Sequence, residues 1–146
     1  MRIVLQRVRK ANVSVDGKII GEIGLGFVLL VGVDPEDTEE DASYLAEKCA
    51  HLRIFDDDEG KMNYSILDVG GEALVISQFT LYGDCRKGRR PSFARAASPD
   101  KADVLYEKVK EYLGAFDINV QGGQFGAKML VNIWNDGPVT FILEST

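Results

Sequence analysis

The residues with the clearest chemical potential lie in one short segment, VISQFTLYGD. Its apolar first part predicts a strand over residues 73–81. Because alternate residues of a strand face opposite sides, Gln78 and Thr80 are expected to share one face. Ser77 and Phe79 then occupy the other face. An amide, a hydroxyl and the backbone N–H of Phe79 could form an oxyanion hole, although an ordinary polar sheet edge has the same pattern.

A strongly basic loop follows this segment. Residues 86–95 contain no acidic residue, whereas the whole chain has a net charge of −6. The basic side chains are Arg86, Lys87, Arg89, Arg90 and Arg95. A local cationic loop on an acidic protein suits a small anionic target, such as a phosphate or one end of a nucleic acid. A solvated surface loop without a partner is equally compatible with this composition.

A second group of candidate residues is NDGPVT, at residues 135–140. The Gly137-Pro138 bond could belong to a plain tight turn between two strands. Most X-Pro bonds are trans, so the sequence alone favours trans here. A cis bond would direct two successive carbonyl groups almost the same way, and such a pair could contact a small substrate.

Several common catalytic motifs are absent. A Ser-His-Asp triad would need the single histidine, His51, and nothing in the sequence brings it near Ser77 or Thr80. The glycines at 21–26 do not have dinucleotide-binding spacing, and no phosphate-binding loop or His-Glu-x-x-His motif occurs. The acidic stretch at 56–63 departs from a calcium loop at its third ligand and its glycine. We therefore predict no metal and no cofactor.

Bulk composition predicts a single soluble domain over residues 1–146. The chain is 45% hydrophobic and 27% charged, and no apolar run is long enough to span a membrane. The first residues resemble a strand and not a signal peptide, so we expect a cytoplasmic protein. Cys49 and Cys85 are then expected to be reduced, and with His51 they are too few for a structural zinc site.

The pattern of elements predicts an α+β fold. Helices are expected after Thr38, which forms a capping box with Asp41, and after Ser98, which precedes a proline. A hairpin is expected to turn at Asp16-Gly17. The predicted strands are residues 1–8, the two arms of that hairpin, 27–33, 53–55, 73–81, 118–121, 129–134 and 139–144. We expect a curled, barrel-like sheet, mixed or mostly antiparallel, covered by the two helices.

Three segments together resemble the D-aminoacyl-tRNA deacylase family, which is also called the D-tyrosyl-tRNA deacylase family. They are SQFTLYGD at 77–84, RPSF at 90–93 and NDGPVT at 135–140, and the opening MRIVLQRV is also similar. The resemblance covers essentially the whole chain. It implies hydrolysis of the ester bond of D-aminoacyl-tRNA, and of mischarged glycyl-tRNA, with L-aminoacyl-tRNA rejected.

The resemblance also implies an arrangement of the site. The protein is expected to be a homodimer in which each subunit inserts a cis Gly137-Pro138 pair into its partner's pocket and excludes L side chains. Arg7 is expected to hold this loop, and Met129 to line the pocket. Ser77 would help bind the substrate. The residues expected to contact the acceptor end of tRNA are Arg86, Lys87, Arg89 and Arg90.

The mechanism is expected to rest on positioning and on oxyanion donors from Gln78, Phe79 and Thr80, with the terminal ribose 2′-hydroxyl helping to activate water. Thr80 as a nucleophile is the alternative, but no base is evident near it. A module that binds RNA ends without catalysis is a further alternative, since the basic loop supports it equally well.

Overall fold

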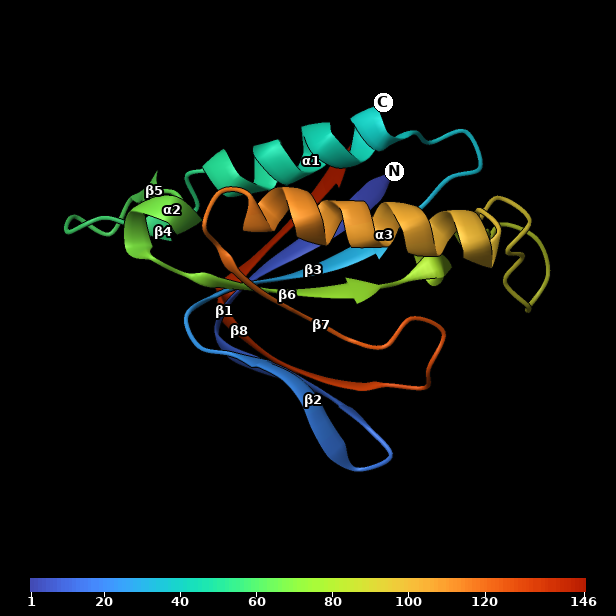
Figure 1. Cartoon of the computed structure of the whole chain (residues 1–146), viewed down its shortest axis with the longest axis horizontal. Coiled ribbons are helices and arrows are strands. Elements are labelled where there is room, and N and C mark those ends of the chain that lie inside the picture. Colours follow the sequence, from blue (N-terminus) through green and yellow to red (C-terminus); the bar gives the residue numbers. More distant parts are fainter.

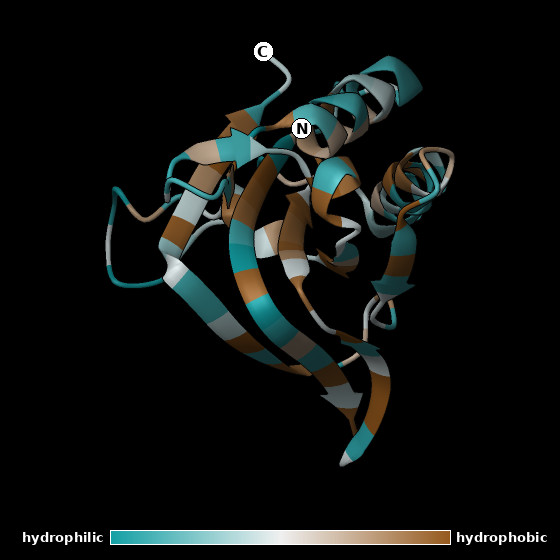
Figure 2. Ribbon diagram, turned by 90° about the vertical axis from the view of Figure 1, so that its left-hand side faces the viewer, coloured by the Kyte–Doolittle hydropathy of each residue, from teal (hydrophilic) through white to brown (hydrophobic).

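The computed structural model describes all residues 1–146 and is organised around one long strand. Strand β1 (Arg2–Val15) pairs in antiparallel orientation with β8 (Leu130–Glu144). On its other side, β1 pairs first with β3 (Gly26–Gly32) and then with β2 (Lys18–Ile23). The long strands carry alternating hydrophilic and hydrophobic bands, as expected for strands that cover a core with one face (Figure 2). Residues 2–15 form one continuous strand, where the sequence suggested two.

The rest of the sheet is parallel. Strand β3 pairs with β6 (Glu72–Ser77), and β6 pairs with β7 (Asn119–Gly122). The two ends of this strand path approach each other, because a Cβ atom added at Gly21 in β2 would lie 2.8 Å from the carbonyl oxygen of Gly122 in β7. The sheet is thus mixed and curls into a nearly closed barrel, and the predicted fold class is confirmed.

Two long helices lie side by side on one face of the sheet (Figure 1). Helix α1 (Glu39–His51) begins with the predicted capping box, in which the Thr38 N–H donates to the Asp41 carboxylate at 2.7 Å. Helix α3 (Pro99–Gly114) begins after Ser98, also as predicted. None of the helices combines the length and the apolarity that a membrane crossing requires.

The two faces of the sheet bury two separate cores. The larger cluster lies between the sheet and the helices, and includes Leu5, Leu29, Leu45 and Tyr106. The smaller cluster lies inside the curled part of the sheet. Its buried members are Val8, Ala11, Val13, Ile23, Val28, Leu74 and Ile76. Strands β3 and β6 therefore have both faces covered, which explains their nearly continuous apolar sequences.

A small peripheral unit connects α1 to β6. It consists of β4 (Phe55–Asp56), β5 (Met62–Tyr64) and the one-turn helix α2 (Ile66–Val69), which Ser65 caps. The sequence predicted only a strand at 53–55 here. The acidic turn between β4 and β5 is closed by its own hydrogen bonds, and no group of three or more potential metal ligands occurs in the chain.

The NDGP segment is not a turn between two strands, as the sequence suggested, but a bulge inside β8. Strand β8 pairs Thr140 with Gln6 and Asn135 with Val8, so residues 136–139 lie opposite the single residue Arg7. The chain does not reverse here, because β1 continues on the other side of the bulge and resumes pairing with β8.

Candidate active site

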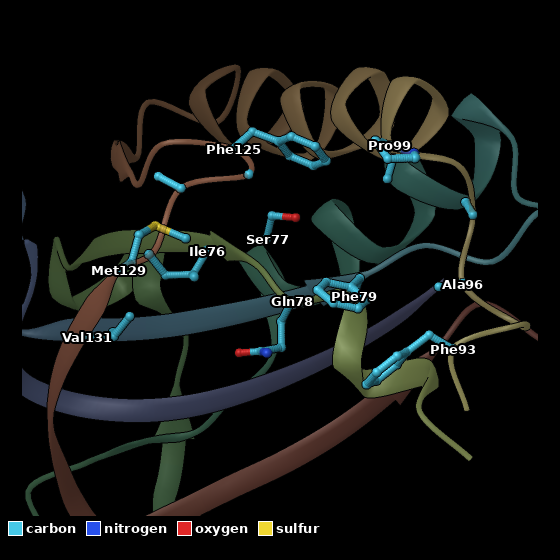
Figure 3. Close-up of a pocket in the computed structure, with 14 residues that line it drawn as sticks. Ile76, Ser77, Gln78, Phe79, Phe93, Ala96, Pro99, Phe125, Met129 and Val131 are labelled. Carbon is cyan, nitrogen blue, oxygen red and sulfur yellow. The ribbon is translucent and has the colours of Figure 1, made fainter. Parts of the chain in front are cut away.

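A pocket of about 550 Å³ opens where β6 and β7 end, beneath the first turn of α3 (Figure 3). Most of its lining is apolar, and the residues come from three separate stretches of the chain. They are Ile76, Ser77, Gln78, Phe79, Phe93, Ala96, Ala97, Pro99, Ala102, Phe125, Gly126, Ala127, Met129 and Val131. No side chain among them is titratable near neutral pH, and the only polar side chains are those of Ser77 and Gln78.

The polar strand end forms one wall of the pocket, but the strand is shorter than predicted. Strand β6 stops at Ser77, and residues 79–82 form a 3₁₀ helix, η1 (Phe79–Tyr82). Its turn is closed by hydrogen bonds from Leu81 N to Gln78 O and from Gly83 N to Thr80 O. The apolar residues of this segment fit a tight turn as well as they fit a longer strand, so the sequence pattern could not show that β6 ends at Ser77.

The 3₁₀ turn changes the reason for which Gln78 and Thr80 lie together. Their closeness does not come from strand alternation, because only Gln78 adjoins β6. The turn instead brings the Gln78 amide nitrogen into hydrogen-bond contact with the Thr80 hydroxyl. In Figure 3 the side chains of Ser77 and Gln78 point to opposite sides of the strand end. Thr80 is exposed and is not part of the pocket lining itself.

Aromatic side chains form the rim. Phe79 is 53% exposed and Phe93 41% exposed, and their rings meet edge-to-face with centroids 5.0 Å apart. Phe125 contributes a third ring from the opposite wall (Figure 3). Neither Phe93 nor Phe125 was predicted from the sequence to belong to the site, although Phe93 is part of the RPSF motif. The position of Phe93 within the basic loop could have indicated a role for it, since exposed aromatic rings beside cationic residues often stack on nucleobases.

Met129 lines the pocket beside Ile76 of β6 (Figure 3). Its position depends on Gly123, because a Cβ atom added there would lie 2.5 Å from the Met129 sulfur. The glycine-rich connection after β7 is therefore required for close packing around the pocket.

Gly137 and Pro138 do not line the pocket of their own chain. They are exposed in the bulge of β8, and the peptide bond between them is cis. The Asn135 side chain braces the bulge, accepting from Val139 N at 3.0 Å and donating to the Thr140 hydroxyl at 3.0 Å.

Arg7 anchors the same bulge from within the fold. Its guanidinium group is buried and donates to the backbone oxygen of Asp136 at 3.1 Å and to that of Ile54 at 2.8 Å. A third hydrogen bond of 3.1 Å reaches the carboxylate of Asp56. Arg7 therefore connects the bulge to β4, a link that β-strand periodicity in the sequence could not indicate.

The basic loop beside the pocket keeps most of its charge free. The Arg86 guanidinium is paired with Asp84 at 2.6 Å, and this hydrogen bonding holds the pKa of the Asp84 carboxyl far below its usual range. Lys87, Arg89, Arg90 and Arg95 are exposed and form no ion pair or side-chain hydrogen bond. Four of the five cations of the loop thus remain unpaired.

His51 and the two cysteines lie away from the pocket. His51 Nδ1 lies 2.9 Å from the Glu47 carbonyl oxygen on α1, and its ring contacts Phe116. Cys49 is buried and Cys85 is exposed, and both are free thiols.

Comparisons with known proteins agree with this architecture. A sequence profile of the D-Tyr-tRNA(Tyr) deacylase family matches residues 4–144. Proteins named D-aminoacyl-tRNA deacylase from Bacillus cytotoxicus and Bacillus cereus are each 60% identical, over 99% of both chains.

Two solved structures share the fold. The one named c-Myc DNA unwinding element binding protein is 39% identical, with a TM-score of 0.93 over 100% of this chain and 99% of that chain. A probable eukaryotic D-amino acid tRNA deacylase superposes with a TM-score of 0.84 at 18% identity, over 98% of both chains. With a family profile and close relatives that span nearly its whole length, this chain belongs to the D-Tyr-tRNA(Tyr) deacylase family.

Proposed function

We propose that the protein hydrolyses the ester bond of D-aminoacyl-tRNA, releasing the D-amino acid and free tRNA, and thereby removes wrongly charged tRNA before translation uses it. The observation that carries this proposal is the composition of the pocket. It is apolar, has no titratable side chain and combines a polar strand end with an aromatic rim. Four unpaired cations lie in the loop that carries Phe93. Such a site suits a labile ester on the end of a nucleic acid better than a substrate that needs acid–base chemistry.

The polar strand end supplies the proposed catalytic groups. Water attacks the ester carbonyl, the carbonyl oxygen becomes an oxyanion, and the tRNA 3′-oxygen leaves with a proton. The Phe79 N–H precedes the first hydrogen bond of the 3₁₀ turn, which Leu81 N donates, and it is proposed to donate to the oxyanion. The Gln78–Thr80 contact orients a second donor beside it. One oxyanion donor typically contributes about 3–4 kcal/mol to transition-state stabilisation.

The tRNA end is proposed to bind across the rim. The terminal adenine stacks near Phe79 and Phe93, and the terminal 2′-hydroxyl helps to activate the attacking water. The phosphates meet Lys87, Arg89 and Arg90, whereas Arg86 mainly fixes the loop through Asp84. This substrate would place the activity in the cytoplasm, where tRNA is charged.

Selection between enantiomers is proposed to depend on a second copy of the chain. Gly137 and Pro138 are exposed, firmly held by Arg7 and absent from their own pocket. In a homodimer each pair would enter the partner's pocket, contact the α-amine of the aminoacyl group and leave no room for an L side chain. D side chains point away and glycine has none, so both are accepted, and L-aminoacyl-tRNA is excluded by shape.

The sheet provides a suitable face for this dimer. Val4 pairs with both Leu30 and Ile142, so these three apolar side chains share the face turned away from the helices. Ile142 is 69% exposed. Leu30 also pairs with Ile76, which lines the pocket, so a partner on this face would sit next to the pocket. Burial of such a face is what a stable homodimer requires.

The direct test is deacylation of one tRNA charged with either D-tyrosine or L-tyrosine, with glycyl-tRNA as a third substrate. We expect cleavage of the D-tyrosyl and glycyl esters and survival of the L-tyrosyl ester. Equal cleavage of both enantiomers would contradict the proposed exclusion. Salt-dependent tRNA binding that leaves every ester intact would instead support a module that binds nucleic-acid ends without catalysis.

A further inference from the structure

One buried tyrosine lies where the two pocket-forming strands separate. Tyr106 on α3 is only 1% exposed, and its hydroxyl donates to the Val75 carbonyl oxygen at 2.7 Å. Burial raises the pKa of Tyr106 to about 12, and a tyrosine hydroxyl is protonated at neutral pH even without this shift. Tyr106 is not among the pocket-lining residues, and the proposed mechanism assigns it no part.

The hydroxyl is located at the last paired residues of β6 and β7. Pairing between these strands ends at Val75 and Gly122, after which both chains diverge to form opposite walls of the pocket. A Cβ atom added at Gly122 would lie 2.9 Å from the Tyr106 hydroxyl oxygen. The hydroxyl is therefore packed against both strands at the point of divergence.

The strand pairing shows which backbone groups lie just beyond the point where β6 and β7 diverge. Pairing of β6 with β3 continues to Ser77, and Gln78 N donates to the Val31 oxygen at 2.8 Å. Because successive residues of a strand direct their N–H and C=O groups to opposite neighbours, Ser77 directs its own toward the side that β7 has left. Those backbone groups have no ladder partner in β7.

The second wall depends on the same tyrosine. The Phe125 ring, which lines the pocket, lies 6.1 Å from the Tyr106 ring between centroids. Gly123, directly after the last ladder pair, allows Met129 and Ile76 to meet, since an added Cβ would lie 2.5 Å from the Met129 sulfur and 3.3 Å from Ile76 Cδ1. A shift at the divergence point would move both walls.

We propose that Tyr106 is a positioning residue of the site, whose hydroxyl fixes the separation of β6 and β7 and so places Ser77, Gln78 and Phe125 around the ester. The expected change in kcat rests on the proposed deacylase function. The expected change in the packing of β6 and β7 does not depend on that function. The residue acts through Val75 and Gly122 and does not touch the substrate.

The test compares Tyr106→Phe with Tyr112→Phe. Tyr112 lies on the same helix and its hydroxyl contacts Glu39, so the control also loses one hydroxyl contact, away from the pocket. For Tyr106→Phe we expect kcat for D-tyrosyl-tRNA to fall between about 5-fold and 100-fold, with KM changed less than about twofold, because the reacting groups are misplaced by a fraction of an ångström. Tyr112→Phe should retain wild-type kinetics.

Hydrogen exchange measures the same effect without catalysis. In Tyr106→Phe, the backbone amides of residues 76–80 and 123–127 should exchange about fivefold faster, as loss of one hydrogen bond of ordinary strength predicts, while those of α1 keep their rates. If wild-type protein shows no deacylation, the proposed function fails but this comparison still decides the role of Tyr106. Unchanged exchange in both segments, or an equal increase throughout the molecule, would overturn the proposal.

A second variant approaches the contact from the other strand. Gly122→Ala retains the hydroxyl but places a methyl group against it, whereas Gly114→Ala adds a methyl with no atom within 4 Å. Gly122→Ala should reproduce the kinetic and exchange pattern of Tyr106→Phe, and Gly114→Ala should not. Should Tyr106→Phe fail to fold, Gly122→Ala decides by the same criteria.

Discussion

The anchoring of the Gly137-Pro138 bulge by Arg7 can be tested by replacing Arg7 with lysine. Lysine keeps the positive charge but cannot reproduce a planar group that donates in several directions at once. In the native protein the guanidinium reaches Asp136 O at 3.1 Å, Ile54 O at 2.8 Å and the Asp56 carboxylate at 3.1 Å. Lys can satisfy only part of this set, and the oxygens that it leaves are partly buried.

The magnitude follows from these contacts. A hydrogen bond from a charged donor contributes about 1.5–3 kcal/mol, so the loss of one to two of them should destabilise the protein by about 2–4 kcal/mol. For a domain of this size that corresponds to a fall in Tm of about 6–12 °C. The matched control is Arg9→Lys, because Arg9 pairs with the same Asp136 at 3.3 Å but its side chain is 80% exposed. A surface pair of this kind contributes at most about 1 kcal/mol.

The assay combines thermal unfolding with rates of deacylation for D- and L-tyrosyl-tRNA. Besides its lower Tm, Arg7→Lys should show a D-to-L rate ratio reduced by at least about tenfold, since a loosened bulge excludes L side chains less well and 1.4 kcal/mol corresponds to that factor. Arg9→Lys should retain both properties. Equal Tm values for the two variants, or an unchanged ratio in Arg7→Lys, would refute the reasoning.

Three further predictions follow from single sites. Gly137→Ala adds a methyl group 2.7 Å from a Val139 methyl, at a residue whose φ is +128°. It should lower the free energy of unfolding by about 1–3 kcal/mol, measured by thermal unfolding, and reduce the ratio of D- to L-tyrosyl-tRNA cleavage. Wild-type values of both quantities would contradict this prediction. Thr80→Ala should keep deacylation within about tenfold, because the Thr80 hydroxyl accepts from the Gln78 amide and helps to orient it, while the Phe79 N–H remains as the proposed oxyanion donor. A loss beyond about a thousandfold, together with a trappable acyl adduct on the wild type, would show that Thr80 is a nucleophile. Burial raises the pKa of the Cys49 thiol to about 12. Iodoacetamide at pH 8 should therefore label only Cys85 in the native protein, and both thiols after denaturation, as measured by mass spectrometry. Labelled Cys49 in the native protein would contradict this prediction.

Much of the fold was predictable because its signals are local. The capping box at Thr38 and Asp41, the serine before α3 and the Asp-Gly hairpin turn each depend on a few neighbouring residues, and all three are present in the structure. Strand β3 was recognisable because both of its faces are buried, which produces an uninterrupted apolar run.

The errors lie where distant segments decide the structure. Residues 79–82 have a strand-like sequence, but β6 loses its partner β7 at Gly122 and the chain turns into η1. The NDGP segment has the composition of a turn, yet β1 continues opposite it and converts it into a bulge filled by Arg7. No local pattern contains that information.

The site was predictable in part for the same reason. Ser77, Gln78 and Phe79 are consecutive, and motif resemblance indicated Met129. The apolar walls from Phe93 to Ala102 and around Phe125 are ordinary loop and helix residues until the fold brings them together. The position of Tyr106 at the divergence of β6 and β7 likewise becomes evident only in three dimensions.

The central claim, that the Gly137-Pro138 bulge of one subunit completes the pocket of another, can be tested by mixing two defective variants. Ala96→Trp fills the pocket but leaves the bulge intact, and Gly137→Ala alters the bulge but leaves the pocket intact. After subunit exchange at equal concentrations, half of the dimers are mixed. In each mixed dimer the open pocket of the Gly137→Ala subunit receives the native bulge of the Ala96→Trp subunit, so one of its two sites is intact. The mixture should therefore recover about one quarter of the wild-type D-selective deacylation. If the mixture remains no more active and no more selective than the two variants measured separately, the bulge does not act across subunits and the account is wrong.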